Sequence, residues 1–346
     1  MSIDVFSVYD KQWLLLKNRV VMSAMTRGFS TNRLCNKKMQ EYYVRRAKND
    51  VGLIITEGII IHPSGDGYNN VPHMWSIEQA ESWRETINKV HDYNSKMVAQ
   101  LWHCGRISHS DYTEGESPVS STNIAATGVN RQNNKPYGKP KALNQSGIYE
   151  IIEMYVHSTK LALDCGFDAV EIHMGHGYLI DQFFDSRVND RTDKYGGTVE
   201  NRCRFALELL EVLIENFGSE KIIIRISPSR FMGEIYNWPD LDEMLIYFVS
   251  KIQKIGLKII DISCANADYY ETSGVIIRKV RAQGWKGIII GGASLSLEQA
   301  NHEIDESYLD LVTWARSILA NVDFVSQLKN NKELRTMTDK IRMELY

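Results

Sequence analysis

The sequence predicts an α/β protein that folds as a (β/α)8 TIM barrel, with residues 1–346 forming a single domain. Short apolar runs alternate with longer helical patterns along the whole chain, giving eight strand–helix units. The runs are almost continuous in Ile and Val, which is typical of parallel strands buried on both faces. A doubly wound sheet is the competing architecture, but no Gly-x-Gly-x-x-Gly motif follows the first strand. The pattern therefore favours the barrel, with an active site on the loops that follow its strands.

Each predicted strand is short and lies between polar or glycine-containing segments. They cover residues 19–23, 52–57, 97–102, 167–172, 221–226, 258–263, 287–290 and 309–313. Apolar residues at helical spacing predict helices over 38–49, 77–93, a segment around 148–156, from about 198, after 239, over 276–282, from about 296, and over 318–328. Thr198 is the predicted N-cap of its helix, with Glu200 in the first turn.

A polar segment at about residues 105–145, rich in Ser, Thr, Asn and Gly, separates the third strand from the third helix. It is too long for a structureless loop in a compact domain. We expect an excursion over one mouth of the barrel that contains a small hairpin.

Composition excludes several classes of protein. The net charge of -3 and the lack of a basic stripe argue against a nucleic-acid binder. No apolar run approaches the roughly 20 residues of a membrane span, and the N-terminus lacks a secretory signal. Five scattered cysteines without a Cys-x-x-Cys spacing argue against zinc and iron–sulfur sites. The sparse cysteines favour a cytoplasmic protein, and the oligomeric state is left open.

In a barrel, the residues just beyond each strand should meet at one site. The earlier strands supply amide, hydroxyl, imidazole, phenol and guanidinium groups, whereas the last two supply a Gly-Gly turn and an arginine. Backbone N–H groups with an arginine suit a phosphate, so a phosphorylated ligand is expected. The strand ends are Ala24, Met25, Thr26, Gly58, Gln100, Trp102, His103, His173, His176, Tyr178, Arg225, Ser263, Gly291, Gly292, Trp314, Ala315 and Arg316.

Residues 173–205, HMGHGYLIDQFFDSRVNDRTDKYGGTVENRCRF, resemble the signature of the old yellow enzyme family of FMN-dependent ene-reductases. The likeness extends to LKNRVVMSAMTR (16–27), GLIITEG (52–58), AQLWHCGRIS (99–108) and IRISP (224–228). The resemblance implies non-covalent FMN that NADH or NADPH reduces. It also implies hydride delivery to the β-carbon of a small-molecule alkene that a carbonyl or nitro group activates.

The resemblance also implies roles for single residues. On the substrate side, His173 and His176 would donate hydrogen bonds to the carbonyl oxygen, and Tyr178 would protonate the α-carbon as general acid. Trp102 and Tyr68 would shape the same side. The flavin-binding set would be Ala24, Met25, Thr26, Gly58, Gln100 and Arg225, with Gly291, Gly292, Ala315 and Arg316 at the phosphate.

Other interpretations of these residues stay open at this point. The two histidines alone could be core residues or a metal pair. A metal needs a third ligand in register, but Glu171 lies on the strand and no better candidate occurs, so no metal is predicted. Arg225 could form an internal ion pair with Glu57 or Asp261. Alternatives at the level of function are a redox-neutral flavin isomerase, a dedicated biosynthetic enzyme, and a degenerate FMN-binding protein.

Three positions depart from the family pattern. Ala24 and Val322 stand where proline is usual, and Ala315 stands where glycine is usual. Ala315 adds a methyl group where backbone approaches the phosphate, so FMN affinity is the property most affected. The loop from Asn189 to Gly197 is expected to have a structural role, with Arg191 and Asp193 paired.

Overall fold

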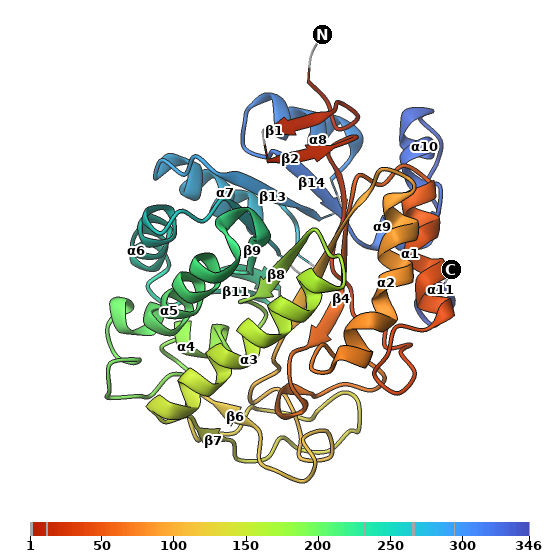
Figure 1. Ribbon diagram of the computed structural model, residues 1–346. Coiled ribbons are helices and arrows are strands. Elements are labelled where there is room, and N and C mark those ends of the chain that lie inside the picture. Colours follow the sequence, from red (N-terminus) through yellow and green to blue (C-terminus); the bar gives the residue numbers. More distant parts are fainter. Residues whose placement is uncertain (1–2, 12, 232, 265–266, 294, 346) are drawn as a thin grey trace.

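A closed barrel of eight parallel strands lies at the centre of the computed structural model, which describes residues 3–11, 13–231, 233–264, 267–293 and 295–345 (Figure 1). The last strand pairs with the first, so the sheet has no free edge. Each predicted strand has its counterpart, and the predicted barrel is confirmed. In order around the barrel the strands are β3 (Val20–Met22), β4 (Leu53–Ile60), β5 (Lys96–Trp102), β8 (Ala169–His173), β9 (Ile222–Ile226), β12 (Ile259–Ile262), β13 (Ile288–Ala293) and β14 (Leu311–Trp314).

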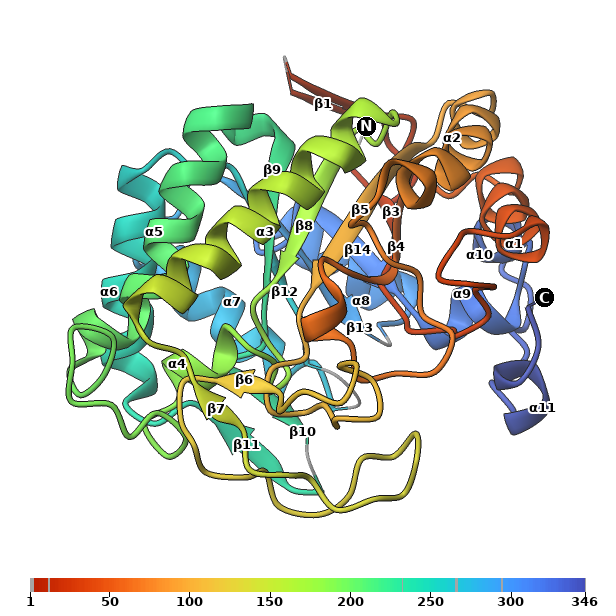
Figure 2. The same ribbon diagram turned by 60° about the horizontal axis from the view of Figure 1, so that its bottom comes forward.

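Helices cover the outside of the barrel (Figure 2). The predicted N-cap at Thr198 is present, because its side chain accepts a hydrogen bond of 3.3 Å from the backbone N–H of Asn201. The long helices are α1 (Lys37–Lys48), α2 (Ile77–His91), α3 (Gln145–Asp164), α5 (Val199–Phe217), α6 (Leu241–Lys254), α7 (Ser273–Ala282) and α8 (Leu297–Asp305). Shorter turns of helix are η1 (Pro63–Gly65), α4 (Asp181–Phe184), η2 (Ser219–Lys221) and α11 (Asp339–Arg342).

The prediction of one closing helix over residues 318–328 is wrong. The segment forms two short helices, α9 (Arg316–Ala320) and α10 (Phe324–Lys329), and Asn321 between them is extended with φ -129°. The Asn321 side chain pairs with the backbone of Arg335, donating to its carbonyl at 3.1 Å and accepting from its N–H at 2.9 Å. This tertiary contact ends the helix where the apolar pattern alone would continue it.

Different structural elements cover the two ends of the barrel. A hairpin of β1 (Tyr9–Lys11) and β2 (Leu14–Leu16) lies at the end opposite the excursion (Figure 1). In the excursion, β6 (Val119–Ser120) and β7 (Lys141–Ala142) pair in parallel, so they are not the expected hairpin. The antiparallel bridge between Val129 and Pro136 makes a hairpin tip instead. Another hairpin, β10 (Ser229–Phe231) with β11 (Ile235–Asn237), follows β9.

The barrel interior is built in two chemically different layers. The layer nearer the amino ends of the strands is an apolar plug that includes Leu53, Val98, Ala169, Ile223, Ile259, Ile290 and Leu311. Alternate residues of a strand face the same side, so the next inward-facing positions lie one layer nearer the carboxyl ends. These positions hold Gln100, Glu171, Arg225 and Asp261, all of them buried. The apolar plug therefore closes the barrel near the amino ends of the strands. The four polar and charged residues form a polar floor that faces the carboxyl ends.

Among the described residues, no helix has both the length and the apolar character that crossing a membrane requires.

Candidate active site

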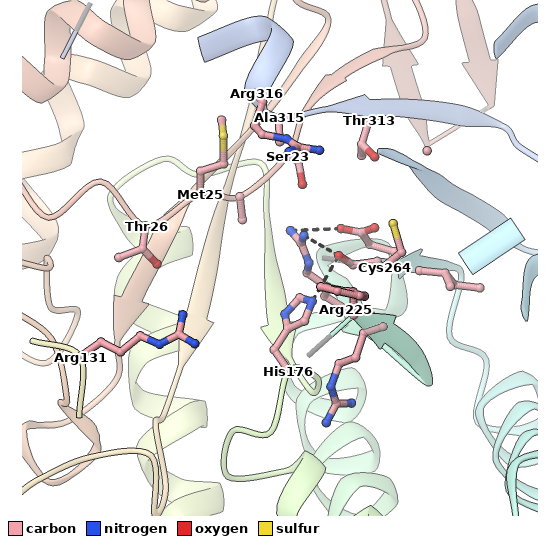
Figure 3. A pocket seen from close by; sticks show the side chains of 17 residues that line it. Ser23, Met25, Thr26, Arg131, His176, Arg225, Cys264, Thr313, Ala315 and Arg316 are labelled. Atoms are coloured by element: carbon pink, nitrogen blue, oxygen red, sulfur yellow. Dashed lines mark hydrogen bonds and ion pairs between the residues drawn. The ribbon is translucent and has the colours of Figure 1, made fainter. Parts of the chain in front are cut away.

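A cavity of about 570 Å³ opens at the carboxyl ends of the barrel strands, within the size range of ligand sites (Figure 3). Predicted residues that line it are Ala24, Met25, Thr26, His176, Arg225, Gly292, Ala315 and Arg316. A smaller cavity of about 130 Å³ shares Ala24, Thr26, His176 and Arg225 and adds Gln100, Trp102, His173 and Tyr178. Strand ends far apart in the sequence thus meet at one place.

Three predicted residues lie beside these cavities. Tyr68 places its hydroxyl 2.6 Å from that of Tyr178. Gly58 leaves room for the Trp102 ring, which any side chain at that position would meet. Gly291 faces outward, since a Cβ there would lie 2.9 Å from the Ile277 side chain of α7.

Several lining residues were not predicted as site residues. Arg131 extends toward the cavity from the excursion, and its sequence surroundings carry no signal of this (Figure 3). Arg230 comes from the unpredicted hairpin after β9. Asp261 was considered only as an ion-pair partner. Its inward position on an otherwise apolar strand is the signal that could have found it.

His173 is the last residue of β8, and His176 lies on the tight turn that directly follows the strand. His176 has φ 57°, a left-handed conformation that costs on the order of 1 kcal/mol. Its N–H donates to Ser227 Oγ at 2.7 Å, which offsets this cost. Gly175 allows the approach, because a Cβ there would lie 2.6 Å from Ser227 Oγ. The turn brings the two rings together, with His176 Nδ1 3.3 Å from His173 Nε2.

The buried carboxylate of Asp181 stabilises the turn that follows β8. It accepts hydrogen bonds of 2.7 Å from the Gly177 N–H and from Trp238 Nε1. It also forms a buried ion pair of 2.9 Å with Arg230. Arg230 in turn donates to the Ser227 carbonyl at 2.9 Å. Asp181 and Arg230 therefore stabilise the backbone of the turn and of the Ser227 segment that contacts it.

Burial determines the protonation states of His173, His176 and Tyr178, which line the smaller cavity. Burial holds the pKa of His173 well below its ordinary value, and Arg225 and Arg230 lower it further. Burial likewise lowers the pKa of His176, with His173 and Arg225 adding to the effect. Burial and Tyr68 raise the pKa of Tyr178 well above its ordinary value. At neutral pH the site thus offers two neutral imidazoles, each with one N–H, and a protonated phenol.

A hydrogen-bonded chain joins the polar floor to the histidines (Figure 3). Arg225 donates to Ser263 Oγ at 2.9 Å, and Ser263 Oγ lies 3.4 Å from His176 Nε2. Because a guanidinium only donates, the Ser263 oxygen is the acceptor of that bond and its own proton can be given to His176 Nε2. With Ser263 as the donor to Nε2, the His176 proton lies on Nδ1, beside His173.

The cavity walls fit FMN, the cofactor that the sequence implies. Nε of Arg225 is buried without a hydrogen-bond acceptor among the described residues, which leaves it available to an electron-rich ligand edge. Gly292 lines the other part of the wall with φ 136°, and a Cβ there would lie 2.7 Å from the Thr313 carbonyl. Ala315 and Arg316 lie at the end of the cavity away from His176 in Figure 3. A flat polar group and a phosphate can therefore bind at opposite ends.

The carboxylates of Asp261, Glu171 and Glu57 all lie on barrel strands but have different partners. Arg225 Nη1 lies 3.5 Å from Asp261 Oδ2 and 3.9 Å from Glu171 Oε1, so the internal ion pair considered above is present with Asp261. Glu57 instead accepts hydrogen bonds of 3.1 and 2.9 Å from the N–H groups of Arg27 and Gly28. Glu57 thereby holds the loop that carries Thr26.

We expect Glu57→Gln to flatten the pH dependence of stability. Burial raises the pKa of Glu57 to about 7 from an ordinary 4.5, although the two N–H groups oppose the shift. The folded state thus retains a proton that the unfolded state loses, so this group lowers the free energy of unfolding as pH rises from about 4.5 to 7. The change is on the order of 3 kcal/mol at most.

Urea unfolding of the FMN-loaded protein at pH 5 and pH 7.5 measures this effect. The exposed Glu243→Gln serves as control. An equal pH dependence in Glu57→Gln and wild type would show that Glu57 is ionised throughout this range.

The loop from Asn189 to Gly197 has contacts that fit its expected structural role. Asn189 Nδ2 donates to the carbonyls of Phe183 and Tyr195 at 2.8 Å each. Arg191 and Asp193 form the predicted ion pair at 2.5 Å. No group of three or more His, Cys, Asp or Glu side chains that could hold a metal occurs in the described part of the chain.

Comparison with known proteins gives consistent matches along the chain. A model of the NADH:flavin oxidoreductase / NADH oxidase family matches residues 9–335. The 12-oxophytodienoate reductase 1 of Oryza sativa subsp. japonica is 32% identical, covering 93% of this chain and 85% of the relative. The 12-oxophytodienoate reductase 7 of the same organism is 30% identical, covering 97% and 90%.

Solved structures match as well. Morphinone reductase superimposes with a TM-score of 0.89 at 29% identity, covering 99% of this chain and 93% of the other. A structure of morphinone reductase in complex with tetrahydroNAD has a TM-score of 0.88 at 28% identity, with coverages of 98% and 94%.

Proposed function

The chain belongs to the NADH:flavin oxidoreductase / NADH oxidase family, the old yellow enzymes, and is an FMN-dependent oxidoreductase; we propose that it reduces the activated C=C bond of α,β-unsaturated carbonyl or nitro compounds with NADH or NADPH. The observation that carries this proposal is the meeting of His173, His176 and Tyr178 in one small cavity beside Arg225. The relatives are named as reductases of 12-oxophytodienoate and of morphinone, which supports a reductive reaction.

The two imidazoles are assigned to the substrate oxygen. Both are neutral, and each can direct one N–H to a carbonyl or nitro oxygen. Such preorganised donors withdraw electron density from the alkene and stabilise the negative charge that develops on the oxygen. When bound, FMN supplies the hydride that reaches the β-carbon.

Tyr178 is assigned as the proton donor to the α-carbon. Its hydroxyl is protonated at neutral pH and lies in the same small cavity as both histidines. The Tyr68 hydroxyl, 2.6 Å away, can donate to the Tyr178 oxygen as that oxygen gives up its proton. The two phenols thus form a short path for the proton, with Trp102 packed against both rings.

The remaining predicted residues are assigned to FMN. Arg225 and Gln100 would contact the ring system, with Ala24, Met25, Thr26 and Gly58 forming the adjoining wall. Gly292, Ala315 and Arg316 would hold the phosphate, and Gly291 would act through the backbone of the same turn. Supporting this division, Arg225, whose buried Nε has no acceptor among the described residues, and Arg316 line the same cavity.

We expect Arg316→Ala to weaken FMN binding about 10- to 100-fold, the effect of removing hydrogen bonds to a charged group. Riboflavin lacks the phosphate, so its affinity should be the same in the variant and in wild type. Titration of the apoprotein with both flavins, followed by flavin fluorescence, measures the two affinities. Equal weakening of riboflavin binding would place Arg316 away from the phosphate.

A steady-state comparison tests the reaction itself. NADH or NADPH is supplied with a panel of cyclic enones and nitroalkenes, and the products are identified. Stoichiometric oxidation of the nicotinamide with a saturated product supports the proposal. Movement of the double bond without oxidation of the nicotinamide would identify the isomerase alternative, and FMN binding without turnover would identify the degenerate alternative.

Two further expectations belong to this proposal. The whole chain is assigned as one domain, supported by one large apolar cluster that includes residues from Val5 to Val325. A cytoplasmic location is supported by five buried cysteines that are all free thiols.

A further inference from the structure

Two carboxyl groups lie inside the barrel, in the layer directly above the apolar plug. Glu171 of β8 is fully buried, and Asp261 of β12 is only 2% exposed. Barrels of this class fill such layers mostly with branched apolar side chains. Asp261 lines the larger cavity, and Glu171 lies in the same inward-facing layer, away from the solvent-exposed surface.

The charges around these acids do not balance. The charged groups that act most strongly on them, in the described part of the chain, are the acids themselves and Arg225 of β9. Arg225 Nη1 lies 3.9 Å from Glu171 Oε1 and 3.5 Å from Asp261 Oδ2. On the opposite side, Gln100 of β5 donates to Glu171 Oε1 at 2.7 Å but carries no charge. Strand β13, next to β12, has no titratable side chain.

Two carboxylates beside one guanidinium would leave a buried negative charge, which is costly. Closely placed carboxyl groups avoid this cost by retaining a proton. Burial and the charge of Asp261 raise the pKa of Glu171 to about 8, and burial raises the pKa of Asp261. Glu171 Oε2 and Asp261 Oδ2 also have no hydrogen-bond donor among the described residues, so a proton on the pair would satisfy an otherwise orphaned oxygen.

We propose that Glu171 and Asp261 share one proton and act as positioning residues that set the charge at the Arg225 end of the flavin site. With one proton, the pair carries one negative charge that offsets Arg225. The wall that Gln100, Glu171, Arg225 and Asp261 form then has no net charge. Without that proton, the wall carries a net negative charge.

This charge matters because the flavin itself gains negative charge when it is reduced. A neutral wall permits the gain, whereas a negative wall opposes it. In the alkaline range, reduction should therefore draw a proton from solvent onto the pair. The two electrons arrive with one hydrogen as hydride from the nicotinamide, one further proton passes from solvent to a carboxylate oxygen of the pair, and no bond between flavin and protein forms. The proposal depends on FMN and on no particular alkene, so a failure to reduce enones would leave it standing.

The reduction potential of the bound flavin, measured from pH 6 to pH 9.5, tests this inference. In wild type we expect the slope to steepen above about pH 8 by about 30 mV per pH unit, the value for one more proton per two electrons. Asp261→Asn and Glu171→Gln each leave one carboxylate to offset Arg225. Their potentials should match wild type at pH 7 and lie above it at pH 9.5, without the change of slope.

Glu303→Gln is the matched control, because Glu303 is a fully buried acid paired with Arg278 at 2.7 Å outside the barrel interior. It should keep the wild-type change of slope. A straight line in wild type, or the same change of slope in both Asp261→Asn and Glu171→Gln, would overturn the proposal.

A measurement on wild type alone covers the case in which a variant fails to fold or to bind FMN. Protons taken up on reduction are counted with a pH indicator in weakly buffered solution. We expect about one more proton per flavin at pH 9 than at pH 7. Equal numbers at the two pH values would overturn the proposal.

Discussion

Tyr178→Phe should leave reduction of the flavin by NADH or NADPH largely intact and slow its reoxidation by 2-cyclohexenone about 10²- to 10⁴-fold, the usual contribution of a general acid. The variant keeps the ring that packs on Trp102 and loses only the hydroxyl that Tyr68 contacts at 2.6 Å. Hydride can still be delivered, but the α-carbon then has no positioned proton donor. Anaerobic stopped-flow absorbance separates the two half-reactions.

Tyr155→Phe is a suitable control for this experiment. Tyr155 is fully buried in α3, and its hydroxyl has no hydrogen-bond partner among the described residues. Its removal should change neither half-reaction. Unchanged reoxidation in Tyr178→Phe would remove Tyr178 from the proton transfer and make a solvent-derived proton the alternative.

His173→Ala should lower the rate of reoxidation by an enone about 10²- to 10³-fold, because one of two preorganised donors to the oxygen is lost. In wild type we expect para-substituted phenols to give a long-wavelength charge-transfer band with the oxidised enzyme, and His173→Ala should abolish this band. His176 Nδ1 lies 3.3 Å from His173 Nε2, so one donor would persist but without its partner. Absorbance titration with a phenol and single-turnover kinetics measure the two effects.

His109→Ala provides the comparison for the histidine variant. His109 lies in the excursion, where its ring accepts a hydrogen bond of 3.1 Å from the Asp111 N–H. Both readouts should match wild type. A phenol band of normal intensity and affinity in His173→Ala would place the oxygen site elsewhere in the cavity.

The barrel and the core of the candidate site could be predicted because both depend on local patterns. A strand buried on both faces requires a run of apolar residues, and His173, Gln100 and Arg225 follow or end such runs. The closed sheet then brings these strand ends together whatever their distance in sequence. The match to a family motif added assignments to residues such as Thr26, for which the local sequence offers no reason.

Features that depend on contacts between distant segments could not be predicted. Strands of three residues, as in the hairpin that carries Arg230, are too short for a periodic signal. The helix break at Asn321 depends on a pairing with Arg335, and the position of Arg131 depends on the path of a long excursion. The shared charge of Glu171 and Asp261 required knowing that both face inward toward one arginine.

A single anaerobic turnover tests the central claim most directly. The FMN-loaded protein is reduced with one equivalent of NADPH or NADH and mixed with one equivalent of 2-cyclohexenone without oxygen. The account predicts that the oxidised flavin spectrum returns and that one equivalent of cyclohexanone forms. A flavin that stays reduced until air is admitted, with the enone recovered unchanged, would contradict it.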